Sequence, residues 1–137
     1  MPVASEVLVD TSVWIKFFRF STAAESLHLD ALLQAKAVCT CAPIRVEILS
    51  GARNDRERLH LRELFSAIPM KEPPVDFWEK VEEARFTLAR KGHQASLVDL
   101  IIASTAAHHQ VPLWTLDEDF ASIQRVVRLP RYLPAEP

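Results

Sequence analysis

Short apolar runs alternate with longer amphipathic segments along the chain. The short runs are rich in β-branched residues and are typical of strands, whereas the longer segments repeat apolar side chains every three or four residues, as helices do. Strands are predicted over residues 7–9, 37–40, 68–70, 113–115 and 125–129. Helices are predicted over residues 12–19, 25–35, 44–52, 56–67, 76–91 and 97–109.

This alternation predicts an α/β fold, in which helices cover both faces of a parallel sheet. The 137 residues suit a single domain over residues 1–137, because domains most often have about 100–150 residues. Three prolines lie in residues 130–137, and we expect this segment to be a frayed tail.

Composition excludes several classes of function. With two glycines the chain cannot form a Walker phosphate loop or a dinucleotide-binding turn, which need several. The net charge of −2 does not indicate nucleic-acid binding by bulk positive charge, so such a role requires local basic patches or a metal. Cys39 and Cys41 are expected to be reduced, buried strand residues. No signal peptide or membrane span is expected, which predicts a cytoplasmic location.

Acidic residues follow the predicted strands or begin the helices after them. Asp10, Asp117 and Asp119 come directly after strands, Asp99 lies in a first helical turn, and Glu47 lies within an apolar helix. Ligands of such sheets bind beyond the carboxyl ends of the strands, so we expect these acids to converge. Clustered carboxylates raise one another's pKa or bind a hard cation such as Mg²⁺ or Mn²⁺, an arrangement suited to phosphodiester hydrolysis.

Each acid also has a purely structural interpretation. Ser96 and Asp99 have the spacing of a capping box, and Asp10 or Ser12 could cap the first predicted helix. Asp119 precedes Phe120 as a cap would. The sequence leaves both interpretations open for every acid.

Four segments resemble the PIN-domain family, specifically the VapC-type toxins of bacterial toxin–antitoxin pairs. Their order and spacing match over about residues 7–129. The segments are Leu8–Trp14, Glu47 with Leu49–Gly51, Asp99–Ala103 and Thr115–Phe120.

The resemblance implies a three-layer α/β/α fold around a five-stranded parallel sheet, and an Mg²⁺- or Mn²⁺-dependent endoribonuclease that acts as a toxin. It also implies a small antitoxin partner, an RNA substrate and a homodimer. Carried over residue by residue, it implies a catalytic quartet of Asp10, Glu47, Asp99 and Asp117. Of these, Asp10, Asp99 and Asp117 would bind the metal, supported by Thr11, Ser12, Thr115 and Asp119.

Two further groups of residues have alternative interpretations. Basic side chains near the acids are candidate RNA contacts, or they belong to solvated helix faces; they are Arg45, Arg53, Arg90 and Lys91. Bulky aromatics in the first helix are candidate antitoxin or dimer contacts, or they pack in the core; they are Trp14, Phe17 and Phe18.

Other functions on a similar sheet are less well supported. A haloacid-dehalogenase-like phosphatase needs a second Asp two residues after the first, where Ser12 stands. A receiver domain needs an Asp after the third strand, where Met70 and Lys71 stand. A non-catalytic binding module that uses the aromatic first helix is the main alternative, and metal binding distinguishes it from a nuclease.

Overall fold

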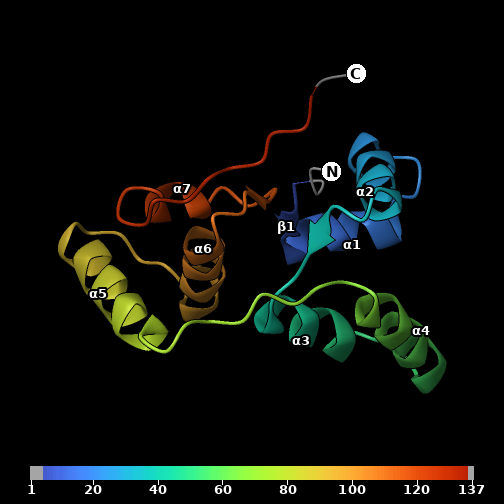
Figure 1. Ribbon diagram of the computed structural model, residues 1–137, viewed down its shortest axis with the longest axis horizontal. Helices are drawn as coiled ribbons and strands as arrows, with labels where there is room; N and C mark the ends of the chain where they lie inside the picture. The colour runs from blue at the N-terminus through green and yellow to red at the C-terminus, as the bar shows by residue number, and fades with distance from the viewer. Residues whose placement is uncertain (1–4, 136–137) are drawn as a thin grey trace.

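The computed structural model describes residues 5–135, and its helices flank a small parallel sheet (Figure 1). Within these residues no helix is both long and apolar enough to cross a membrane. The elements, in chain order, are β1 (Val7–Val9), α1 (Thr11–Arg19), α2 (Ala24–Gln34), β2 (Val38–Cys39), α3 (Ala42–Ser50), α4 (Asp55–Ser66), α5 (Phe77–Arg90), α6 (Leu97–His109), β3 (Leu113–Trp114) and α7 (Phe120–Ile123).

The sheet has the strand order β2-β1-β3, and both pairings are parallel. Leu8 of β1 pairs with Cys39 on one side and with Leu113 on the other. All three residues of β1 are buried, as expected for a central strand with both faces covered. In Figure 1, α1 and α2 pack together on one side of β1, and α5 and α6 pack together on the other.

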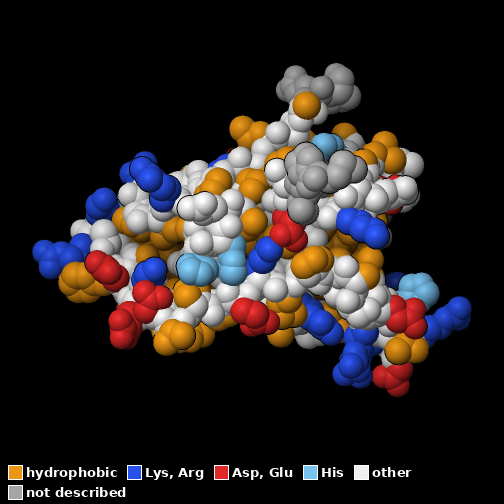
Figure 2. Space-filling model, viewed as in Figure 1, with side chains coloured by type: hydrophobic (Ala, Val, Ile, Leu, Met, Phe, Trp, Pro, Cys, Tyr) orange, Lys and Arg blue, Asp and Glu red, His pale blue; other side chains and the backbone are white. Residues whose placement is uncertain are grey.

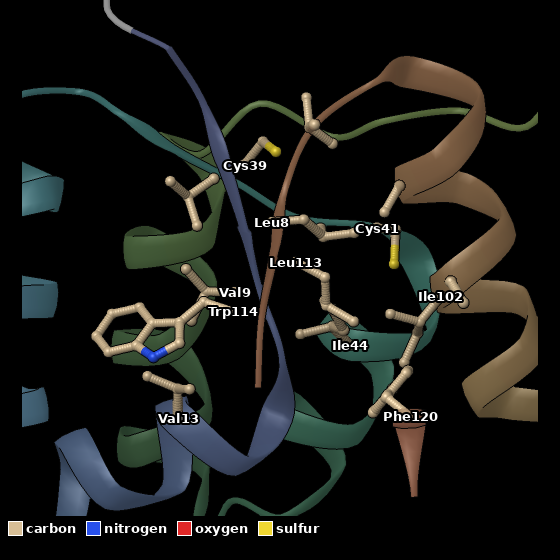
Figure 3. Packing of buried hydrophobic residues seen from close by; sticks show 14 of the residues in the cluster. Leu8, Val9, Val13, Cys39, Cys41, Ile44, Ile102, Leu113, Trp114 and Phe120 are labelled. Carbon is tan, nitrogen blue, oxygen red and sulfur yellow. The ribbon is translucent and has the colours of Figure 1, made fainter. Parts of the chain in front are cut away.

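Side chains alternate between the two faces of the sheet, so each strand contributes to packing on both sides. Figure 3 shows Leu8 and Leu113 on the side that faces Ile102 of α6, and Val9 and Trp114 on the other. All four sheet side chains are at most 2% exposed. The apolar runs found in the sequence therefore form the interior of the molecule.

The expectation of five strands is wrong for the described residues, which contain three strands and two isolated parallel bridges. The predicted strand at 68–70 is reduced to one bridge, between Thr40 and Met70. The predicted strand at 125–129 is a turn, because Val127 N–H donates to the carbonyl of Ile123 and continues the helical path of α7.

The predicted frayed tail is ordered at its start. Pro130 accepts a hydrogen bond from Leu113 N–H at 2.9 Å, and Tyr132 N–H donates back to Leu113 at 2.9 Å. The Tyr132 ring also packs against Trp114, with ring centroids 5.6 Å apart. The backbone pairing and this aromatic contact fix residues 130–132, whereas residues 136–137 lie outside the described part.

Both cysteines are free and buried, as the sequence predicted. Only Cys39 lies in a strand, because Cys41 is the residue that precedes α3. Burial raises the pKa of Cys39 to about 12 and that of Cys41 to about 12, so both thiols are neutral at physiological pH. They therefore behave as small apolar side chains of the core.

Candidate functional site

Asp10 stands at the carboxyl end of β1, where it caps α1. Its side chain is only 6% exposed. Oδ2 accepts hydrogen bonds from Ser12 Oγ and from Thr115 Oγ1, each at 2.8 Å. Every hydrogen bond found to this carboxylate within residues 5–135 goes to Oδ2, so the donors fix its orientation and leave Oδ1 available.

The loop after β3 is held by hydrogen bonds from its backbone to side-chain oxygens. Leu116 N–H donates to Ser12 Oγ at 3.0 Å, and Asp117 N–H donates to Thr115 Oγ1 at 3.0 Å. Asp119 N–H donates to Asp117 Oδ1 at 2.9 Å. The two hydroxyls thus bridge Asp10 to this loop, which positions its carboxylates relative to β1.

Three carboxylates meet beyond this edge of the sheet. One oxygen each from Asp99, Asp117 and Asp119 lies within 4.8 Å of the others. Asp99 also fulfils its structural interpretation, because its N–H donates to Ser96 Oγ at 3.0 Å at the start of α6. Asp99 therefore takes part in the cap of α6 through its backbone and belongs to the acidic group through its side chain.

Burial raises the pKa of Asp99 above its ordinary value of 3.8, and the negative charges of Asp10, Asp117 and Asp119 raise it further. A hydrogen bond with Ser96 acts in the opposite direction. The acids repel one another, and a divalent cation with oxygen ligands would relieve that repulsion. The donor set, made only of carboxylate oxygens, fits Mg²⁺ or Mn²⁺.

We expect Asp99→Asn to stabilise the metal-free fold at neutral pH. Because the folded state raises the pKa of Asp99, ionisation of Asp99 costs folding free energy as the pH rises above 3.8. The variant should therefore be more stable than the parent in EDTA near neutral pH, and the difference should vanish below pH 3.8. Urea unfolding across this range measures it; a variant of equal or lower stability at neutral pH would contradict the prediction.

The structure does not bring all predicted acids into this group. Asp10 acts on Asp99 through its charge but is not among the three that meet. Glu47 is exposed on α3, although its apolar neighbours suggested a buried position. The reason is the orientation of α3, which buries Ile44 and Ile48 and leaves the intervening residues Val46 and Glu47 facing outward.

Asp119 is a full member of the group, although the sequence predicted only a supporting role with an uncertain function. Its spacing of two residues from Asp117 was the available signal. The hydrogen bond from its N–H to Asp117 Oδ1 explains how two acids so near in sequence can face one centre. Thr11, predicted to support the site, has a buried hydroxyl without a partner in the described residues.

The aromatic residues of α1 separate into buried and accessible members. Trp14 is 0% exposed and packs against Phe65, with ring centroids 4.9 Å apart. Its predicted contact with a partner is therefore wrong, because α1 turns this side chain into the core. Phe17 is half-buried, and Phe18 is 45% exposed while its ring stacks on Trp14.

The predicted RNA-contacting residues differ in exposure and in their contacts. Arg53 is exposed and pairs with Glu57 at 3.1 Å, and Arg90 lies over the ring of Phe86. Arg45 is half-buried, and Lys91 is exposed at the end of α5. Contact with RNA stays a prediction for all four basic residues.

Comparison with known sequences gives consistent matches. A family profile described as the PIN domain matches residues 7–126. The chain is 30% identical over 129 residues to VapC ribonuclease Mb1587 of Mycobacterium bovis, covering 90% of this chain and 95% of that protein. It is 34% identical over 121 residues to ribonuclease VapC5 of Mycobacterium tuberculosis, covering 85% of this chain and 86% of that protein.

Comparison with solved structures shows a shared fold at low sequence identity. The structure of VapBC-1 from nontypeable Haemophilus influenzae gives a TM-score of 0.75 at 17% identity, covering 92% of this chain and 96% of that one. VapBC2 from Rickettsia felis, bound to a DNA fragment from its promoter, gives 0.73 at 18% identity, with the same coverage.

Proposed function

The chain belongs to the PIN-domain family, among its VapC-type proteins, and we propose that it is a metal-dependent endoribonuclease that serves as the toxin of a toxin–antitoxin pair. One observation carries the proposal: Asp99, Asp117 and Asp119 meet at the carboxyl edge of the sheet, next to an oriented Asp10. The names of the curated relatives support ribonuclease activity, and the group of acids explains how this chain would perform it.

We assign the metal ligands to Asp10, Asp99 and Asp117, with Glu47 completing the catalytic quartet. Mg²⁺ or Mn²⁺ bound there would lower the pKa of a coordinated water and offset negative charge on the phosphodiester. Asp119 lies close enough to Asp99 and Asp117 to bind directly or to accept a hydrogen bond from a coordinated water.

The surrounding residues keep these ligands in place. Ser12 and Thr115 each donate to Oδ2 of Asp10, which keeps Oδ1 oriented without further hydrogen bonds from the described residues. Thr115 also accepts from Asp117 N–H, so one hydroxyl couples two proposed ligands. Hydrogen bonds to a metal ligand commonly tune metal affinity, because they determine where the ligand oxygen points.

Cleavage of total bacterial RNA by the purified, antitoxin-free chain tests the proposal. We expect discrete cleavage products with Mn²⁺ or Mg²⁺ and none with EDTA. Intact RNA under all conditions, together with no Mn²⁺ binding at millimolar concentration, would overturn the proposal. A non-catalytic binding module would then be the better interpretation.

We further propose a small antitoxin partner, a homodimeric assembly and a cytoplasmic site of action. Solved structures with this fold include the Klebsiella pneumoniae chain described as a toxin–antitoxin complex. In this chain, apolar side chains of α1 and its end are accessible: Ile15 is 41%, Phe18 45% and Phe20 59% exposed. Exposed apolar side chains close together are typical of interaction surfaces.

For Phe18→Ala we expect at least about a tenfold loss of antitoxin affinity, because a partly exposed aromatic ring is a typical anchor in interfaces. Its half-exposed ring should contribute little to folding, so the free energy of unfolding should change much less. Calorimetric titration with the antitoxin measures the affinity. Unchanged affinity would exclude Phe18 from the antitoxin interface.

A further inference from the structure

A cavity of about 600 Å³ lies between α5, α6 and the turn that follows α7. Residues that line it include Lys91 at the end of α5, Ser104 and His108 on α6, and Arg125 in the turn. None of the proposed metal ligands lines the cavity. It is therefore distinct from the acidic group, although α6 contributes to both.

The lining carries more positive than negative charge. Lys80, Lys91 and Arg125 face it together with one acid, Glu83. Within residues 5–135, neither Lys91 nor Arg125 has a carboxylate within 4.0 Å, although Lys80 pairs with Asp76. In Figure 2, Lys and Arg side chains lie over the end of the molecule formed by α5 and α7, with acidic side chains interspersed. Arg125 Nη1 lies 3.2 Å from His93 Nε2. Its remaining N–H donors and the Lys91 ammonium are available to an anion here.

Ser104 adds a hydrogen-bond donor to this cavity. Its side chain is 9% exposed, and its hydroxyl has no hydrogen bond within the described residues. Other hydroxyls in these two helices bond to their own backbone: Thr105 donates to Ile101 at 2.7 Å, and Thr87 donates to Glu83 at 2.9 Å. Ser104 Oγ is not one of the buried side-chain atoms without a partner, so it is accessible from the cavity and can donate to a ligand there.

We propose that this cavity binds a phosphate group of the RNA strand, outside the cleavage centre. The inference rests on the proposed ribonuclease function and adds a second point of contact with the substrate. Lys91 and Arg125 would supply charge, and Ser104 would donate a hydrogen bond to a phosphate oxygen.

The fold connects this cavity to the acidic group through two helices. Ser104 follows Asp99 by five residues on α6, an axial rise of about 7.5 Å and a rotation of about 140° around the helix. Asp119 precedes α7, and Arg125 lies in the turn that ends it. An RNA strand that passes around α6 would place one phosphate at the acids and another in the cavity.

RNA binding without cleavage tests this proposal. A short fluorescein-labelled single-stranded RNA is titrated with the full chain in EDTA, and the anisotropy is measured over a series of salt concentrations. Each phosphate contact with single-stranded RNA contributes about 0.7 to the slope of log affinity against log salt. The cavity takes one phosphate, so we expect Lys91→Gln/Arg125→Gln to lower the slope by about 0.7 and the affinity by about fivefold at 0.1 M salt.

The matched control is Arg19→Gln/Lys36→Gln, which removes two exposed cations beside α1 and α2, across the sheet from the cavity. It should bind RNA as the parent does. Ser104→Ala removes one hydroxyl with little change in volume and should weaken binding by a smaller factor. Equal loss in both double variants, or no loss in Lys91→Gln/Arg125→Gln, would overturn the proposal, as would a parent that does not bind RNA.

A second measurement separates RNA from free anions. Inorganic phosphate is titrated into the labelled chain, and the amide NMR shifts of residues 91, 104 and 125 are followed. Shifts there, combined with unchanged RNA affinity in the double variant, would mean that the cavity takes a small anion and would overturn its role in RNA binding. If the parent chain does not cleave RNA, but Lys91→Gln/Arg125→Gln still weakens RNA binding, the result would count against the nuclease function and not against the phosphate site.

Discussion

Asp99→Asn should abolish Mn²⁺ binding and lower RNA cleavage by more than about 100-fold. Losing a residue that only supports a ligand costs 10–100-fold in metal affinity, so loss of a ligand should exceed that range. Asp99 is the member of the acidic group whose pKa is raised by burial and by the surrounding carboxylates. Calorimetric titration of Mn²⁺ into the antitoxin-free chain measures the binding.

The substitution is well suited to this test because Asn is nearly isosteric with Asp. The cap of α6 uses the backbone N–H of residue 99 and Ser96 Oγ, so the variant can retain it. Asp30→Asn is the matched control, since Asp30 is an exposed acid on α2 that contacts Gln34. Retained Mn²⁺ binding in Asp99→Asn, with a folded variant and an unaffected control, would remove Asp99 from the metal site.

Trp14→Ala should lower the free energy of unfolding by about 3–5 kcal/mol, the range found for large aromatic residues deleted from cores. The indole is 0% exposed and contacts the rings of Phe17, Phe18 and Phe65. Its removal leaves a cavity where α1 meets α4, because surrounding side chains relax only partly. Urea unfolding followed by circular dichroism measures the loss.

The Phe18→Ala variant is the comparison for this second prediction. It removes an aromatic ring from the same helix, but one that is 45% exposed, so its effect on unfolding should be smaller. A loss below about 1.5 kcal/mol for Trp14→Ala would contradict the packing described for Trp14, since that is half of the lower limit of the expected range.

Local sequence patterns predicted the elements that position the candidate site. The run Val7–Val9 is β1, and the helix that begins after Ser96 carries Asp99 in its first turn. These predictions succeeded because buried strands and capped helices have signals within a few residues. The association of the acids followed from a general property of parallel sheets, whose strands all end at the same edge.

The errors arose where tertiary packing decides the outcome. Val126 and Val127 have strand-like side chains, but α7 continues into them as a turn. Glu47 has apolar neighbours, yet α3 rotates it to the surface. Trp14 and Phe18 are one helical turn apart with similar side chains, and only the packing of α1 shows that the first is buried and the second exposed.

The hydrogen bonds around Asp10 also affect when activity can arise during synthesis. Asp10 is joined to Thr115, 105 residues further along the chain, and the loop that carries Asp117 and Asp119 follows directly. A ribosome-bound chain that ends before this loop lacks both the second hydroxyl and two of the three acids that meet. The proposed centre can therefore form only after the loop that follows β3 has been synthesised and has folded onto β1.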